Sequence, residues 1–274
     1  MPFAAILGAG PLGGTLTHTL SSRALFDEVR LVDPAGDVAA GKALDIRQAG
    51  PPDGVSTRVT GHADVAAAAG AWVLALADPI PRETAADAVA LIRRAVAVAP
   101  GALLVCAAYE HASLLHRLVG EGVIAPDLVV GSAPSAVAAA ARALVAAHVD
   151  RSFHDIVVTV TDEPHLPGRI RVDWACSSIA GRAAEAVLPR EHRARLDDRL
   201  ARSLPPGPMA LASAAARFVE AAWFGSRAHQ PAWVVDTALV GSPPPARQPV
   251  ARVVSVRFAP GGRLERMRHP LNGP

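Results

Sequence analysis

The sequence predicts an α/β fold in which a doubly wound parallel sheet is followed by a smaller α+β domain. Up to about residue 150, short apolar runs alternate with longer Ala-rich amphipathic stretches, and the first apolar run ends at a cluster of glycines. Beyond that point the order changes to strands, then helices, then strands. Alternation of strand and helix is typical of βαβ units, which build parallel sheets. We therefore expect two domains, over residues 1–149 and 150–274.

The elements of the first half each have a local signal. The run Phe3–Leu7 is continuously apolar and ends at Gly8, as expected of a strand buried on both faces. Asp37 is the expected N-cap of the second helix, and the breaker Gly50-Pro51-Pro52 follows that helix. The expected strands are 3–7, 29–32, 72–76, 102–106 and 128–130, and the expected helices are 11–22, 37–48, 84–98, 111–120 and one after Pro134.

The second half is expected to hold helices between two groups of strands. Apolar alternation and β-branched residues predict the strands, and Pro/Gly-rich breaks at 241–245 and 260–262 separate the last three. The expected strands are 156–160, 170–174, 232–240, 250–258 and 263–267, and the expected helices are 177–187, 190–202 and 209–223.

Composition narrows the class of protein. The chain has 274 residues, 51% hydrophobic and 19% charged, which is too apolar and too weakly charged for a disordered protein. No apolar stretch reaches the ~18 residues that a membrane-spanning helix needs. The N-terminus lacks the basic region of a signal peptide. We expect a soluble cytoplasmic globular protein that does not bind a membrane.

Charge and cysteine content exclude two further classes. The net charge is +2, and the arginines are dispersed with no block of like charge, so we expect no nucleic-acid partner. Cys106 and Cys176 are the only cysteines, and each stands beside apolar residues. The sequence therefore offers neither a disulfide framework nor a metal-ligand cluster.

A dinucleotide fingerprint follows the first strand. Residues 8–13 read GAGPLG, the pattern G-x-G-x-x-G between a strand and a helix. In this pattern the first glycine permits a tight turn, the second lets the backbone approach a pyrophosphate, and the third allows close packing of helix and strand. Backbone N–H groups at the start of the helix would then hold the phosphates. The residues expected to contact the cofactor are Gly8, Gly10, Pro11, Leu12, Gly13 and Asp33.

Asp33 indicates which dinucleotide the groove takes. It ends the second strand, 20 residues beyond Gly13, where a carboxylate accepts hydrogen bonds from the ribose hydroxyls. The same carboxylate would repel a 2′-phosphate, so the sequence favours NAD over NADP. The alternative is a glycine turn kept only for packing, with Asp33 as a cap of the loop.

With these residues in place, the chain resembles the lactate/malate dehydrogenase family over nearly its whole length. Residues 6–18 are similar to the family's cofactor loop, and 33–46 are similar to the segment after its second strand. Residues 79–82 stand where its mobile active-site loop begins. Residues 174–181 resemble the start of its substrate-domain helix, and 208–224 resemble its long C-terminal helix.

The resemblance implies hydride transfer between NAD and a 2-hydroxy or 2-keto acid. The family uses a His as acid/base, an Asp that orients it, an Arg that binds the substrate carboxylate, and a second Arg on a closing loop. This chain departs from that set. Ser135 falls at the Asp position and Ala138 at the Arg position, with Arg142 one turn further on. Tyr109-Glu110 replaces an Asn-Pro pair, and the closing loop is shorter by roughly ten residues.

Two catalytic candidates remain, His165 and Arg82. Arg82 stands in the segment that begins the mobile loop. His165 falls at the family's His position if one residue is inserted before Trp174. The alternative for His165 is a loop histidine on a polar turn, and a new pairing with Asp162 or Glu163 stays open. The other histidines are expected at the surface, without metal-ligand spacing, among them His111, His116, His148, His192 and His229.

Three functions follow from these observations. The first is an NAD-binding relative of the family whose 2-hydroxy-acid oxidoreductase activity is lost or much altered, acting as a sensor of NAD or NADH or beside an active relative. The second is an active NAD-dependent oxidoreductase that uses His165, with Arg82 or Arg142, on a hydroxy or keto acid or a related small substrate. The third is a structural protein that binds no nucleotide. Losses in several separate segments favour the first, and by resemblance we expect a homo-oligomer with contacts at 37–48 and 209–223.

Overall fold

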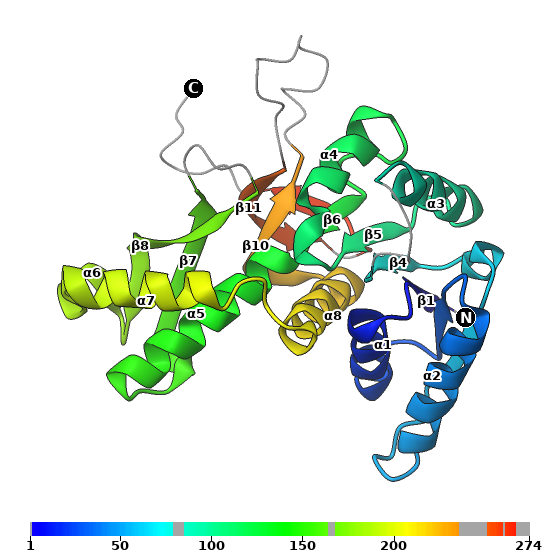
Figure 1. Cartoon of the computed structure of the whole chain (residues 1–274), viewed down its shortest axis with the longest axis horizontal. Coiled ribbons are helices and arrows are strands. Elements are labelled where there is room, and N and C mark those ends of the chain that lie inside the picture. The colour runs from blue at the N-terminus through cyan, green and yellow to red at the C-terminus, as the bar shows by residue number, and fades with distance from the viewer. Residues whose placement is uncertain (1, 79–84, 164–167, 236–250, 260, 267–274) are drawn as a thin grey trace.

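Two sheets organise the computed structural model, which describes residues 2–78, 85–163, 168–235, 251–259 and 261–266 (Figure 1). Within these residues one sheet has nine strands, in the order β12-β11-β10-β6-β5-β4-β1-β2-β3, and the other has three, in the order β7-β8-β9. The strands of the large sheet that come from the first half are β1 (Phe3–Leu7), β2 (Glu28–Val32), β3 (Arg58–His62), β4 (Val73–Leu76), β5 (Leu103–Cys106) and β6 (Val129–Gly131).

The six strands from the first half are parallel, which confirms the predicted doubly wound sheet. The chain builds outward from β1 in one direction to β3, then returns to the other side of β1 with β4. The helices of this half are α1 (Pro11–Ser22), α2 (Gly36–Ala49), α3 (Ala85–Val98) and α4 (Ala112–Gly120). The carboxyl ends of β1 and β4 lie side by side at this reversal, which is where open α/β sheets bind ligands.

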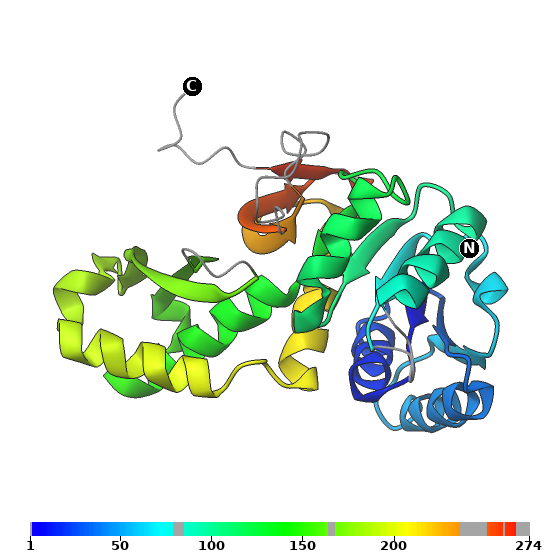
Figure 2. The same ribbon diagram turned by 45° about the horizontal axis from the view of Figure 1, so that its top comes forward.

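Helices cover both faces of the large sheet. On one face α1 packs against α2 and against α8 (Pro208–Phe224), whereas α3 packs against α4 on the other face (Figure 1). The long helix α5 (Ala133–Val149) contacts α8 and also β7, so it connects the large sheet to the small one. Figure 2 shows the small sheet, α6 (Ala184–Val187) and α7 (Arg190–Arg202) at one end of the molecule.

The chain returns to the large sheet at its end. Strand β10 (Ser226–Val234) pairs antiparallel with β6 through Trp233 and Gly131, and β11 (Arg252–Phe258) and β12 (Leu264–Arg266) extend the same edge. A side chain at Gly131 would place its Cβ 3.0 Å from the Cβ of Trp233, so the glycine makes room for this indole. The division into domains at residues 149 and 150 stays a prediction.

The segment expected as a helix at 177–187 is helical only over 184–187, and its first part forms strands, so the prediction was wrong for 177–183. The small sheet consists of β7 (Ile156–Asp162), β8 (Ile170–Ile179) and β9 (Arg182–Ala183), and β8 runs through residues 174–179. Ile170, Val172 and Ile179 are buried along β8, and a bulge opposite Val157–Thr159 shifts the alternation between them. These β-branched residues pack on a half-buried sheet face, which outweighs the local resemblance to a helix start.

Two smaller differences concern the first half. Asp37 is not the N-cap of α2, because the helix begins at Gly36 and Asp37 lies within its first turn. Strand β3 was not expected, since Arg58–His62 is mostly polar and only Val59 is fully buried. It forms because β2 offers it a parallel edge from Glu28 to Val32.

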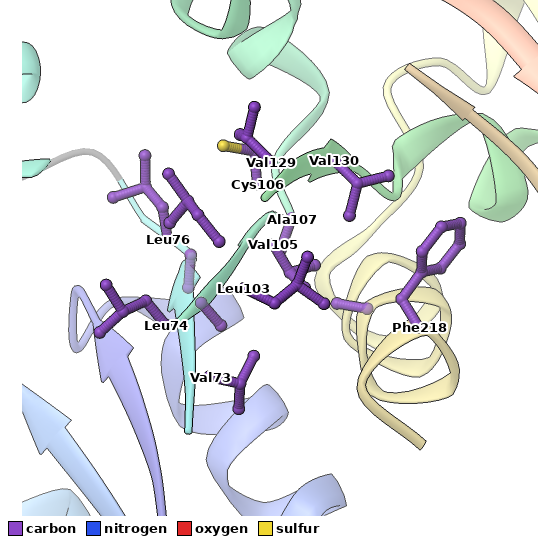
Figure 3. Packing of buried hydrophobic residues seen from close by; sticks show 14 of the residues in the cluster. Val73, Leu74, Leu76, Leu103, Val105, Cys106, Ala107, Val129, Val130 and Phe218 are labelled. Carbon is purple, nitrogen blue, oxygen red and sulfur yellow. The ribbon is translucent and has the colours of Figure 1, made fainter. Parts of the chain in front are cut away.

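One large apolar core includes the strands of the nine-stranded sheet and the helices that cover its two faces. Figure 3 shows part of this core, with Val105 of β5 on the side of the strands that faces Phe218 of α8 and Leu74 of β4 on the other side. Phe218 is fully buried, and its ring meets that of Phe258 edge-on with centroids 5.8 Å apart. Among the described residues, no helix is both long enough and apolar enough to cross a membrane.

His111 lies in the interior, so the expectation that it is a surface residue was wrong. It is 7% exposed, and the backbone N–H of Ala108 donates to its Nδ1 over 3.2 Å. Burial lowers the pKa of His111 to about 4. His148 is exposed as expected, whereas His192 is half-buried, and the two contact each other through Nε2 and Nδ1 at 2.8 Å.

Phe218→Ala should lower the free energy of unfolding by about 3–5 kcal/mol, because it removes a fully buried aromatic ring from the contact between α8 and the sheet. Phe224→Ala is the matched control on the same helix, since Phe224 is 64% exposed, and it should change the free energy by less than about 0.5 kcal/mol. Denaturant unfolding measures both. Equal losses would mean that α8 does not pack on the sheet through Phe218.

The buried imidazole should also make stability depend on pH. The pKa of His111 is about 4 in the folded chain against 6.5 for the free side chain, so between these values the unfolded chain binds the extra proton. Stability is therefore full above pH 6.5 and is lost as the pH falls toward 4, by about 3 kcal/mol in total. His111→Gln keeps an acceptor for Ala108 and should flatten this part of the pH profile, whereas the exposed His18→Gln should not. A profile unchanged by His111→Gln would contradict the assignment.

Candidate functional site

The glycine loop lies at the carboxyl edge of the sheet, between β1 and α1. Gly8 has a φ of +99°, a conformation that L side chains rarely adopt. A Cβ on Gly8 would lie 2.7 Å from the carbonyl oxygen of Asp78, and one on Gly13 would overlap the carbonyl oxygen of Gly8. Pro11 is the first residue of α1, where its missing N–H removes no helix hydrogen bond. The loop has the shape that the fingerprint predicts.

Asp33 lies against this loop, at the end of β2. It is 6% exposed, and its Oδ2 accepts a hydrogen bond of 2.7 Å from the backbone N–H of Ala9. Its Oδ1 accepts one of 2.8 Å from the N–H of Ala35. Each carboxylate oxygen can accept a second bond, so the geometry leaves acceptor capacity for the hydroxyls of a ligand.

Asp78, which the sequence analysis did not single out, occupies the start of α1. It comes directly after β4, and its side chain crosses to the neighbouring glycine loop. Its Oδ1 accepts from the N–H of Leu12 at 3.0 Å, and its Oδ2 accepts from the N–H of Gly13 at 2.5 Å. Bonds of this kind between N–H groups and a carboxylate contribute about 1.5–3 kcal/mol each. A carboxylate immediately after the strand beside β1 was the signal that could have revealed it.

Lys42 also contacts the loop, from the inner side of α2. Its Nζ donates to the carbonyl oxygen of Gly10 over 2.9 Å. A side chain at Gly14 would meet the aliphatic part of Lys42, with its Cβ 3.4 Å from Cδ. The ammonium group therefore lies close to the loop, where it adds one positive charge.

The cofactor that the resemblance implies can be compared with these contacts. The end of β2 fits the ribose of a dinucleotide, because Asp33 faces the loop and has free acceptor capacity. The start of α1 does not fit a pyrophosphate as it stands, because the N–H groups of Leu12 and Gly13 already hold the carboxylate of Asp78. The end of β2 and the start of α1 thus differ in their fit to NAD.

The start of α5 carries no charged side chain. Ser135, at the position where the family's Asp is expected, donates its hydroxyl to the carbonyl oxygen of Pro231 at 2.9 Å. No Asp, Glu, Lys or Arg occurs between Ala133 and Ala141. Arg142 is exposed on the next turn, with its guanidinium 5.7 Å from the ring centroid of Phe153. The side chain of Arg142 is thus positioned by its contact with Phe153. Both residues line a groove that Arg151 also lines.

The two catalytic candidates, His165 and Arg82, both lie outside the described residues. Near the first of them, the N–H of Glu163 donates to the carbonyl oxygen of Arg169 at 2.8 Å. The carboxylate of Asp162 accepts from the N–H of Val253 on β11, at 3.2 and 3.1 Å. Burial raises the pKa of Asp162. Its described contacts connect the small sheet to the large one.

The residues after β5 pack into the protein instead of forming a polar surface. Tyr109 is half-buried, its ring lies edge-on to Trp233 with centroids 5.5 Å apart, and its hydroxyl contacts the backbone of Ile170. Burial is the main cause that raises the pKa of Tyr109. Where the family has Asn-Pro, this chain has a tyrosine that connects β10 with β8.

The described residues do not form a metal-binding cluster. No group of three or more His, Cys, Asp or Glu side chains among them could hold a metal ion. Cys106 is buried and free, and burial raises its pKa to about 12, so its thiol stays protonated at neutral pH.

Comparison of the sequence with known proteins finds partial relatives. The malate dehydrogenase of Neorickettsia sennetsu is 32% identical over 139 residues, which cover 47% of this chain and 44% of that protein. The malate dehydrogenase of a Roseiflexus species is 39% identical over 92 residues, 34% of this chain and 29% of that protein. The aligned segments therefore span less than half the length of these relatives. No family model matches the chain.

Solved structures resemble the whole chain. The malate dehydrogenase of Aeropyrum pernix superposes with a TM-score of 0.84 over 98% of this chain and 91% of that one, at 19% identity. The lactate dehydrogenase of Cryptosporidium parvum, solved with lactic acid and nicotinamide adenine dinucleotide, gives 0.79 over 99% and 91%, again at 19% identity. At this level of identity the likeness shows a shared fold.

Proposed function

We propose that the chain is a dehydrogenase-like relative of the lactate/malate dehydrogenases whose standard 2-hydroxy-acid chemistry is lost or much altered. The partial sequence identity to malate dehydrogenases and the fold shared with them support this proposal. Its proposed cofactor is NAD, as in the related structure solved with that dinucleotide. The observation that carries the proposal is the start of α5, where Ser135 and Ala138 stand at the positions of the charged pair that the reaction needs.

The physical argument concerns the substrate carboxylate and the keto oxygen. A carboxylate is best held by a bidentate guanidinium, and a keto oxygen that gains charge needs a proton donor tuned near neutral pH. Arg142 is the nearest cation on α5, and its stacking on Phe153 takes its head group away from the first turn. Loss of an oriented acid/base alone costs about 10²–10⁴-fold in rate.

The proposed cofactor contact is made by this chain's own Asp33. Its carboxylate would accept from the ribose hydroxyls while it keeps its bonds to the N–H groups of Ala9 and Ala35. The proposal includes weak binding, because Asp78 holds the N–H groups at the start of α1. A homo-oligomer, or an assembly with an active relative, is proposed by resemblance. Its candidate surfaces are α2 and α8, where Leu44 and Met209 are exposed.

Asp33→Ala should lower the affinity for NADH at least about tenfold, because it removes the acceptor for the ribose hydroxyls. Calorimetric titration with NADH, and with NADPH in parallel, measures this. The wild type should reject NADPH because Asp33 repels its 2′-phosphate. Asp37→Ala is the matched control, since Asp37 is exposed in the first turn of α2. An affinity that Asp33→Ala leaves unchanged would mean that the nucleotide lies elsewhere.

Purified protein should not measurably oxidise NADH in the presence of pyruvate or oxaloacetate, because the described end of α5 provides no group to bind the substrate carboxylate. Loss of NADH absorbance measures turnover. His165→Ala, with the exposed His154→Ala as its control, then separates the two enzymatic hypotheses. Turnover that His165→Ala abolishes and His154→Ala does not would overturn the proposal in favour of an active oxidoreductase.

A further inference from the structure

The start of α1 already holds an anion that belongs to the chain. Asp78 places one carboxylate oxygen on the N–H of Leu12 and the other on the N–H of Gly13. Its backbone is held in turn by the end of β4, which pairs with β1 from Ala4–Val73 to Leu7–Leu76. The N–H of Ala77 donates to the carbonyl oxygen of Leu7 at 2.9 Å, which continues this pairing up to Asp78.

These N–H groups are the ones that the glycine fingerprint assigns to a pyrophosphate. Carboxylate and phosphate oxygens are both charged acceptors that compete for the same donors. We propose that Asp78 is a specificity-determining residue, which fills the phosphate position of the glycine loop and so disfavours ligands with a pyrophosphate relative to an uncharged nucleoside. The inference rests on the proposed function for the ribose end of the groove, and deepens it for the phosphate end.

The packing leaves no room for both anions. A Cβ built on Gly13 would lie 2.9 Å from Oδ2 of Asp78, and one built on Gly10 would overlap the Asp78 carboxyl carbon. The carboxylate therefore lies directly on the loop backbone, in the space that the absence of side chains at Gly10 and Gly13 creates. A phosphate could take this place only after the Asp78 side chain had moved away.

The charges around the loop act in the same direction. Asp33 and Asp78 both have their carboxylates on backbone N–H groups of the loop and of the start of α1, and the ammonium of Lys42 lies on the carbonyl oxygen of Gly10. The described contacts of the loop thus combine two negative side chains with one positive side chain. A pyrophosphate would add two negative charges at close range, where the effective dielectric constant is well below that of water.

An uncharged nucleoside meets neither obstacle. Its ribose hydroxyls would donate to Asp33, whose oxygens each keep a free lone pair, and it would bring no anion to the start of α1. The ligand class that the groove favours is therefore a nucleoside with both ribose hydroxyls, with its dinucleotide bound less tightly.

The test compares the wild type with Asp78→Asn and Asp78→Gly. Asp45→Asn is the matched control, because it removes the same charge from an exposed position of α2. Each protein is titrated calorimetrically with adenosine, adenosine diphosphate, NADH and inorganic pyrophosphate, after its melting curve has shown that it is folded. In both Asp78 variants, affinity for the three phosphate-bearing probes should rise at least about tenfold, with adenosine unchanged within about twofold. Asp45→Asn should behave as the wild type.

The outcomes separate this inference from the proposed function. If the Asp78 variants bind NADH as tightly as the wild type does, and bind pyrophosphate as tightly as the wild type does, the inference is overturned and NAD binding is left intact. Gain of pyrophosphate binding in the variants, without binding of adenosine or a preference for NADH, would support the role of Asp78 and overturn the nucleotide groove. Folded variants that bind no pyrophosphate would overturn the inference, whatever they do with adenosine.

Discussion

The close approach of the glycine loop to the end of β4 is the constraint on which the rest of the site depends. Gly8 turns with a positive φ beside the backbone of Asp78, so close that any side chain at position 8 would clash with it. This contact fixes where α1 begins and which N–H groups point at the carboxyl edge of the sheet. It also delivers the Asp78 carboxylate to those groups. The close approach of Gly8 and Asp78 therefore affects both the shape of the loop and the charge beside it.

Close packing also occupies the carboxyl ends of β5 and β6. Tyr109 and Trp233 fill the region after β5 and β6 with aromatic rings, and Ser135 turns its hydroxyl to the backbone of Pro231. The described side chains here are thus aromatic or bonded internally. A fold shared with dehydrogenases thus surrounds an edge whose described residues are suited to packing.

Much of the fold could be predicted from the sequence because its signals are local. The run Phe3–Leu7, the pattern GAGPLG and the Ala-rich helices each identify themselves within a few residues, and the parallel sheet follows from their alternation. The role of Asp78 could not be found in this way, since its partner Gly13 is 65 residues distant in the chain. Its position becomes meaningful only when β1 and β4 are known to be neighbours.

Other differences have the same origin in long-range packing. His111 reads as a helix-start residue, yet tertiary structure buries it and supplies the Ala108 N–H as its partner. Residues 177–179 were expected to begin a helix, yet they continue β8, which pairs with β7. For the candidate site, residue type and spacing predicted that Asp33 lies beside the glycine loop, and it does, whereas its role toward a ribose stays a proposal. His165 and Arg82 lie outside the described residues and stay predictions.

The antiparallel pairing of β10 with β6 affects how a fragment of the first half would behave. The single pairing of Trp233 with Gly131 closes an edge that would otherwise present unpaired backbone groups along β6. An exposed, apolar edge strand is a template for association with other chains. A fragment ending at residue 149 would carry the glycine loop intact, yet it would lose the cover over β6 and the α8 face that seals α1. The strands at the end of the chain therefore protect the first half by covering the edge of β6.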